Sequence, residues 1–201
     1  GPLAYPWGYP LILVPFYAFS GPSPLILKLP GLVFYSGFLI CLYLFAKSRL
    51  TRTESLLFVS LFVLNPLFLK FLDQIFSDIP FLFFSTLTFL LFSQRGAQSR
   101  LYHRWIGISI FFTTFLRATG VLLLGSFLIM EVINVWKNRA DRETVFRVMT
   151  KLSVVCFVFA LLWVTNAFVF PGGGESYLAQ YANPSLETVK NFTVAYFNVF
   201  S

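Results

Sequence analysis

Charged residues are scarce in this sequence, at 11% of 201 residues, whereas a soluble domain carries about 25%. Hydrophobic residues make up 57%, and the chain includes 27 Phe, 9 Tyr and 4 Trp. A soluble domain of this size has no core that could hide so many large apolar side chains. The composition therefore predicts a protein that crosses a membrane several times.

Cysteine and histidine are also nearly absent. Cys41 and Cys156 lie in the middle of apolar runs, so we expect thiols that face lipid or the helix core, and His103 lies in a basic cluster. The patterns HExxH, CxxC, GxSxG and the phosphate-binding glycine loop are missing. Soluble metalloenzymes and hydrolases therefore have little support, and no residue is assigned as a metal ligand.

A signal peptide is missing as well. The chain starts at Gly1-Pro2 without a basic leading segment, and its first residues resemble the middle of a protein. We expect a fragment of a longer chain.

Long apolar segments fill most of the sequence, and a helix needs roughly 20 such residues to cross a bilayer. The segments lie at about 25–46, 54–71, 79–94, 103–117, 119–136 and 149–170. Two of them, near 79–94 and 103–117, are short, and we expect them to extend into their polar flanks. Helices are expected because an open strand would leave backbone groups unpaired in lipid. The predicted fold class is all-α, a polytopic bundle of about six spans at residues 25–170 within a single membrane domain, 1–201.

Basic residues gather in alternate loops. Eleven of the 15 lie in three clusters, formed by Lys47, Arg49 and Arg52, by Arg95, Arg100 and Arg104, and by Lys137, Arg139, Arg142, Arg147 and Lys151. The positive-inside rule predicts that these loops are cytoplasmic. They form no aromatic-interleaved patch, so we expect a lipid bilayer and no nucleic acid as partner.

Both ends of the chain then belong to the outer face. Residues 1–24 are predicted to end an outer loop, with a short interfacial helix at 9–19 whose aromatic side chains lie at headgroup level. Residues 171–201 are predicted to be an outer-face loop with a second helix near 185–200, where apolar positions recur at helical spacing.

Few charges remain at the outer helix ends. The predicted topology places Asp73, Asp78 and Arg117 at the same depth, near the outer membrane surface. There they form either a structural ion pair or a site that binds an anion or a metal. Asp78 also suits a helix start, with Asp or Ser as cap and Pro80 in the first turn. Lys70 either extends to the headgroups or faces a phosphate.

Three other polar positions carry no predicted chemistry. Lys28 is isolated, and Glu131 lies near a cytoplasmic helix end, where we expect it to be solvated. Asn65-Pro66 interrupts the segment 54–71 and predicts a kink, because proline removes a backbone hydrogen bond.

Four blocks occur in a characteristic order. They are "YPWGYPLILVPFYAFSGPSPLILK", "LNPLFLKFLDQIFSDIPFLFFSTLTFLLFS", "FLRATGVLLLGSFLI" with a basic loop after it, and a last span that leads to an outer tail. Together they resemble the GT-C superfamily of polytopic glycosyltransferases, closest to family-39-like members related to protein mannosyltransferases and the lipid A aminoarabinose transferase. The resemblance covers about residues 5–136 well.

The resemblance implies an activity and a location. A sugar passes from a polyprenyl-phosphate donor to a glycan, lipid or protein acceptor on the extracytoplasmic side of the bacterial inner membrane or the ER membrane. The family's acidic residue in the first outer loop acts as base or binds a metal. Asp78 corresponds to a different acidic residue, which opens a span at the outer face and is expected to be catalytic, and Arg117 to the arginine of an Arg-x-x-Gly block that is expected to hold the phosphate. The other residues expected around the substrate are Lys70, Asp73, Tyr5 and Tyr9.

The resemblance also has a gap. In the family, the usual catalytic carboxylate follows the first span, and residues 1–10 offer no equivalent, so we expect this chain to lack it. The implied cofactor is open, and a divalent metal is compatible with the family. The sugar, the acceptor and the oligomeric state are not predicted.

Two other classes compete with a transferase. A transporter or flippase predicts ionisable residues near the bilayer midplane and broken helices there. This sequence places its ionisable residues at one face, which favours the transferase. A non-catalytic membrane protein is the third hypothesis, kept because of the missing carboxylate.

Overall fold

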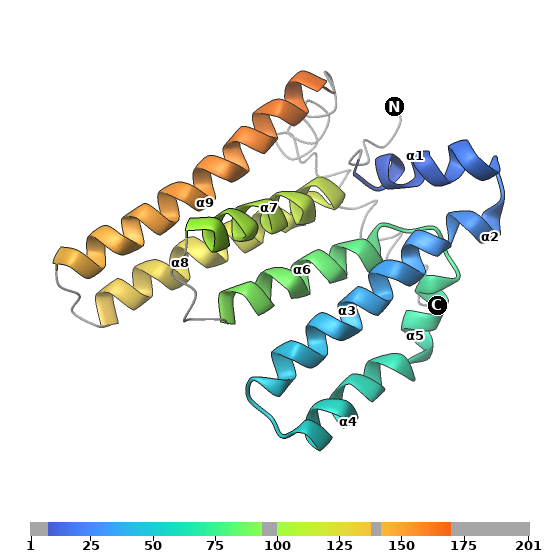
Figure 1. Ribbon diagram of the computed structural model, residues 1–201, viewed down its shortest axis with the longest axis horizontal. Coiled ribbons are helices and arrows are strands. Elements are labelled where there is room, and N and C mark those ends of the chain that lie inside the picture. Colours follow the sequence, from blue (N-terminus) through green and yellow to red (C-terminus); the bar gives the residue numbers. More distant parts are fainter. Residues whose placement is uncertain (1–7, 94–99, 138–141, 170–201) are drawn as a thin grey trace, which may run out of the picture. The chain divides into compact units, whose positions relative to one another are not determined.

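The computed structural model describes residues 8–93, 100–137 and 142–169, and the regular structure in these ranges is entirely helical (Figure 1). Its elements are α1 (Gly8–Ser20), α2 (Pro24–Leu27), α3 (Leu29–Lys47), α4 (Arg52–Val63), α5 (Pro66–Leu72), α6 (Asp78–Ser93), α7 (Arg100–Leu116), the 3₁₀ turn η1 (Ala118–Gly120), α8 (Val121–Lys137) and α9 (Arg142–Val169). The all-α prediction is confirmed for these ranges. The predicted helix near 185–200 and Tyr5 lie outside them.

Local sequence signals explain several helix ends. Thr51 and Glu54 form a capping box at the start of α4, in which the Glu54 carboxylate accepts from the Thr51 backbone N–H at 2.9 Å. Asn65 caps α5 by accepting from the N–H of Leu67 at 2.9 Å, and Pro66 occupies the first helical position. Gly21 ends α1 with a φ of 66°, a conformation that other residues rarely adopt.

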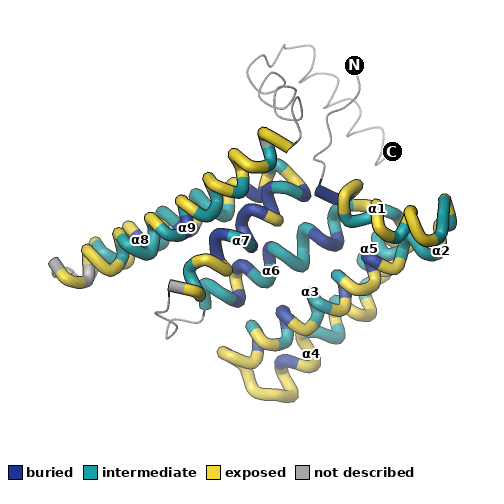
Figure 2. Tube along the Cα trace, turned by 45° about the horizontal axis from the view of Figure 1, so that its top comes forward, coloured by how far each residue is buried: buried dark blue, intermediate teal, exposed yellow. Residues whose placement is uncertain are grey.

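Helix α6 is the central element, with α3 on one side and α7 on the other (Figures 1 and 2). One core lies between α3, α5 and α6, and its buried members are Tyr35, Phe38, Leu42 and Ile79. Phe68 of α5 stacks on Phe38 with 6.0 Å between ring centroids, and the Tyr35 hydroxyl donates to the Phe62 carbonyl at 2.8 Å. Aromatic packing therefore fixes α4 and α5 against α3.

A second core joins the later helices. Its buried members are Ile106, Ile110, Phe127 and Val155, from α7, α8 and α9. Between α6 and α7, the hydroxyls of Thr88 and Ser109 lie 2.7 Å apart, and Ser109 also donates to the Phe84 carbonyl at 3.1 Å. Interhelical hydrogen bonds of this kind hold helices together where lipid can replace apolar contacts.

Within the described ranges, three helical stretches are long and apolar enough to cross a membrane, namely Pro24–Lys47, Ala118–Trp136 and Val145–Asn166. Helices α4 and α5 form a fourth candidate as a bent pair, with 58° between them at Asn65-Pro66, which confirms the predicted interruption. Helices α1 and α6 are apolar but shorter. The structure supports a membrane protein with three or four spans by length and composition, and the remaining spans and the interfacial position of α1 stay predictions.

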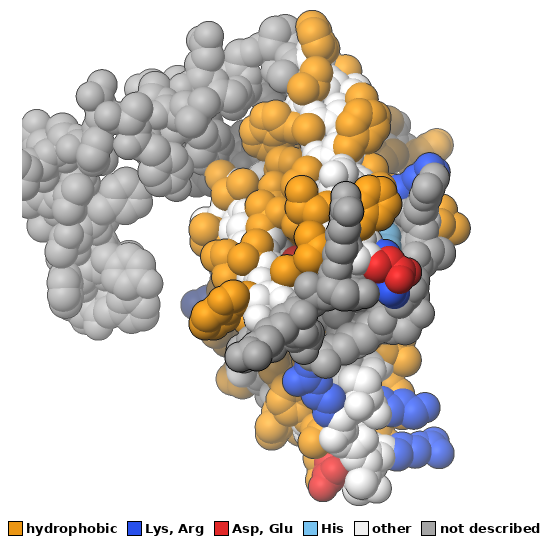
Figure 3. Space-filling model, turned by 90° about the vertical axis from the view of Figure 1, so that its left-hand side faces the viewer, with side chains coloured by type: hydrophobic (Ala, Val, Ile, Leu, Met, Phe, Trp, Pro, Cys, Tyr) orange, Lys and Arg blue, Asp and Glu red, His pale blue; other side chains and the backbone are white. Residues whose placement is uncertain are grey.

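Successive long helices run in alternating directions, so their ends form two sets (Figure 1). The end of α3, the end of α6 and the start of α7 lie together with the end of α8, on the side where the basic clusters are predicted. Figure 3 views this side and shows Lys and Arg side chains in blue among a largely apolar surface. Asp73, Asp78 and Arg117 belong to the opposite set of ends, as the topology predicts.

Candidate functional site

Asp78 is the first residue of α6. The N–H of Phe81 donates to the Ser77 carbonyl at 3.0 Å, so Ser77 holds the cap position and Asp78 lies in the first turn. A carboxylate in the first turn is stabilised by the positive end of the helix dipole. The side chain stays partly exposed, at 32%, so it is accessible to a ligand.

Arg117 lies in the tight connection from α7 to α8. Its backbone is extended, with a φ of −148°, and its carbonyl accepts from the N–H of Gly120 at 2.9 Å. The guanidinium Nη1 donates to Oδ1 of Asp78, and the guanidinium carbon lies 5.7 Å from the ring centroid of Phe81. The structure therefore joins the two residues that the resemblance singles out, across α6 and α7.

Asp73 has a different partner. It follows the last turn of α5, and one of its oxygens accepts from Nζ of Lys28 at 2.6 Å. The side chain of Asp73 is 78% exposed, and exposed pairs contribute only about 0–1 kcal/mol. No partner for Lys28 was predicted from the sequence. In the structure Lys28 pairs with Asp73, and Arg117 pairs with the other aspartate, Asp78.

The other predicted site residues are placed less directly. Lys70 is an exposed residue of α5 and makes no ion pair with any residue of the described ranges. Tyr9 is buried near the start of α1, whose Gly8 packs so closely on α7 that a Cβ there would lie 2.4 Å from the Phe115 carbonyl oxygen. Burial raises the pKa of the Tyr9 phenol, so it stays a hydrogen-bond donor at neutral pH.

The Asp78–Arg117 pair has capacity left for a ligand. The planar guanidinium carries five N–H donors and suits phosphate oxygens, and the hydrogen bond to Asp78 engages Nη1. The pair is partly solvated on both sides, so a ligand can approach either member. In the described part of the chain, no three His, Cys, Asp or Glu side chains come together as a metal site.

Sequence reasoning missed a second ion pair. Nζ of Lys151 on α9 donates to Oε1 of Glu131 on α8, and the Glu131 side chain is only 5% exposed. The prediction that Glu131 is solvated is wrong, and Lys151 lies in α9, within the segment 149–170 that the sequence predicts as a helix. Glu131 and Phe127 are four residues apart on α8, and that spacing beside an apolar position was the available signal.

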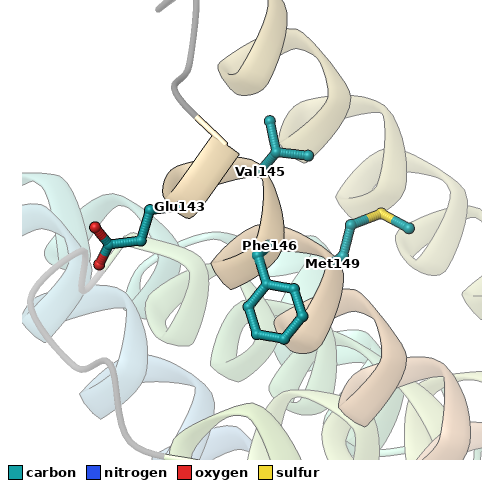
Figure 4. Close-up of a pocket in the computed structure, with 4 residues that line it drawn as sticks. All are labelled: Glu143, Val145, Phe146 and Met149. Atoms are coloured by element: carbon teal, nitrogen blue, oxygen red, sulfur yellow. The ribbon is translucent and has the colours of Figure 1, made fainter.

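One open hollow lies elsewhere, at the start of α9 (Figure 4). Val145, Phe146 and Met149 line it with apolar side chains, and Glu143 points away from Val145 and Met149. The Glu143 carboxylate already accepts from Arg147 at 3.2 Å. None of the predicted site residues lines this hollow, and it offers no unsatisfied polar group.

Comparisons with known proteins add no identity. No family model matches the chain, and neither a curated protein nor a solved structure matches it.

Proposed function

We propose that this protein is a GT-C type membrane glycosyltransferase, a hexosyltransferase that uses a polyprenyl-phosphate sugar as donor. The acceptor is a glycan, lipid or protein on the extracytoplasmic side. The observation that carries the proposal is the contact between Asp78 and Arg117 at one set of helix ends. It brings together a carboxylate and a phosphate-binding cation, as the transfer requires.

The roles of Asp78 and Arg117 follow from an exchange of the partner that Arg117 binds. In the free protein Arg117 binds Asp78. An incoming donor phosphate competes for the guanidinium, because phosphate accepts paired hydrogen bonds from its planar fork. Engagement of the phosphate releases the carboxylate of Asp78, which is then free to accept a proton.

The transfer needs no reagent besides the donor and the acceptor. The acceptor hydroxyl oxygen attacks the anomeric carbon of the sugar and forms the new glycosidic bond. The bond from that carbon to the phosphate oxygen breaks, and its electron pair leaves with the lipid phosphate, whose charge Arg117 stabilises. Asp78 accepts the proton of the acceptor hydroxyl as general base.

A transporter is the second candidate, and one observation favours it. Glu131, whose side chain is buried, and Lys151, whose side chain is 27% exposed, form an ion pair within two helices that are long and apolar enough to cross a membrane. Ionisable residues in such positions commonly mark transport pathways. The pair is closed and lies on different helices from Asp78, so we rank transport second.

The test uses the full-length protein in lipid nanodiscs with a polyprenyl-phosphate hexose. We expect Asp78→Asn to lower turnover by about 10²–10⁴-fold, the usual contribution of a general base. Arg117→Gln should weaken donor binding. The matched control is Glu143→Gln, because Glu143 pairs with Arg147 on the exposed surface of α9, outside the predicted site, and should be dispensable.

Two outcomes would contradict the proposal. The first is a protein that binds no donor, and the second is an Asp78→Asn variant that transfers sugar as fast as the parent. Substrate uptake into proteoliposomes that depends on Glu131 but not on Asp78 would support the transporter instead.

A further inference from the structure

Helix α9 touches the described helices along a narrow stripe. Lys151, Val155 and Val158 are spaced by four and three residues and therefore share one face. Val155 is fully buried against α7 and α8, whereas Phe157 is 68% exposed and Leu161 54%. Leu152 and Phe159 flank this line and pack against the same core, so up to Trp163 α9 is attached along one face.

The closest packing in this stripe is at Gly107 of α7. A Cβ at Gly107 would lie 2.9 Å from the Val155 carbonyl oxygen and 3.0 Å from Cβ of Val158. The two helices therefore approach to backbone contact around this residue. Phe159 of α9 also packs on Phe111 of α7, with 6.5 Å between ring centroids.

The Glu131–Lys151 pair lies one turn from that crossing point. Nζ of Lys151 is 5.4 Å from the ring centroid of Phe127, and Phe127 is itself fully buried. A charge pair of α8 and α9 and a buried aromatic ring thus gather at one end of the stripe.

Lipid changes the relative weight of these contacts. Acyl chains replace apolar side-chain contacts at little cost, so the apolar stripe alone holds α9 weakly. Lipid cannot replace the partner of a buried charge, because a lone charge in hydrocarbon is strongly unfavourable. Of the contacts that hold α9, the ion pair is therefore the one whose loss costs the most free energy when the helices separate.

We propose that the Glu131–Lys151 pair is a latch that docks α9 on α7 and α8. While the pair is closed, α9 stays at the Gly107 crossing. When the pair is opened, α9 moves away from α8 as a rigid helix. This device is independent of Asp78 and Arg117 and does not depend on the proposed transferase activity.

The test measures the distance between α8 and α9 in the full-length protein in nanodiscs. Spin labels are attached at Leu122→Cys and Phe157→Cys, both 68% exposed, with Cys41 and Cys156 replaced by Ala. Pulsed electron spin resonance should give one narrow distance distribution for the parent. Glu131→Gln and Lys151→Met should shift it to longer distances.

Two double variants keep the test decisive when a lone charge prevents folding. The exchange Glu131→Lys with Lys151→Glu should restore the parent distribution. Glu131→Leu with Lys151→Leu leaves no charge in lipid and should still show the long distance. The control is Arg147→Gln, which breaks the exposed Glu143–Arg147 pair on α9 itself and should change nothing. A parent-like distribution in the Leu double variant overturns the latch.

Discussion

Gly120 permits the closest approach in the candidate site, and its substitution gives the sharpest test of the fold. A Cβ at this position would lie 2.4 Å from both the carbonyl carbon of Thr113 and the amide nitrogen of Thr114. These are backbone atoms of α7, so no side-chain rotation relieves the contact. Gly120→Ala must therefore push the α7–α8 connection open.

The size of the effect follows from that distance. Nonbonded carbon atoms are best placed about 3.5–4.0 Å apart, so the backbone has to shift by about 1 Å. Overpacking of this kind costs about 1–3 kcal/mol, and we expect about 2 kcal/mol because both contacts are to backbone. For a chain of this size that lowers the unfolding midpoint by about 4–8 °C.

The control is Gly125→Ala, five residues further along in α8. A Cβ at Gly125 meets nothing within 4 Å. Alanine is favoured over glycine inside a helix by about 1 kcal/mol, so this variant should be as stable as the parent or more stable. Thermal unfolding of both variants in detergent, followed by circular dichroism, measures the difference. Equal midpoints for the two variants would refute the close approach of Gly120 to α7.

Two further substitutions test contacts that hold α4. Thr51→Ala removes the capping box with Glu54 and should destabilise the protein by about 1 kcal/mol, whereas Thr51→Ser should not. Tyr35→Phe removes the hydroxyl that donates to the Phe62 carbonyl at 2.8 Å and should cost about 1 kcal/mol, since the ring packing is retained. Both effects are measured by the same thermal unfolding, and a parent-like midpoint for either alanine or phenylalanine variant would show that the hydrogen bond contributes nothing.

Helix ends were the best-predicted feature of the sequence, because their signals are local. Proline after Asn65 marks the break between α4 and α5, and the start of α6 at Asp78 follows from the Ser-Asp-Ile-Pro pattern. Hydrophobic segments and alternating basic loops then gave the order of the helices. With the ends in order, Asp78 and Arg117 had to lie on the same side.

The sequence alone did not predict which charged residues form ion pairs with each other. The predicted topology placed Asp73 and Asp78 on the same side of the membrane as Arg117. Which of the two aspartates pairs with Arg117 depends on the distance between α2 and α5 and on the distance between α6 and α7. Lys28 takes Asp73 because α2 ends beside α5, a contact between segments 45 residues apart. Side-chain pairing of this kind depends on tertiary packing that periodicity does not describe.

The Glu131–Lys151 pair weakens one argument made from the sequence. Ionisable residues at a single face favoured a transferase, but this pair joins two helices that are long enough to cross a membrane, and its carboxylate is buried. It does not favour transport by itself, because both charges are already satisfied by each other and a conducting or carrying site has to exchange partners. Asp78 and Arg117 differ in this respect, since both are partly exposed and a phosphate can replace one partner without leaving a buried charge alone. The accessible pair is therefore the better candidate for chemistry, and the buried pair for holding α9 in place.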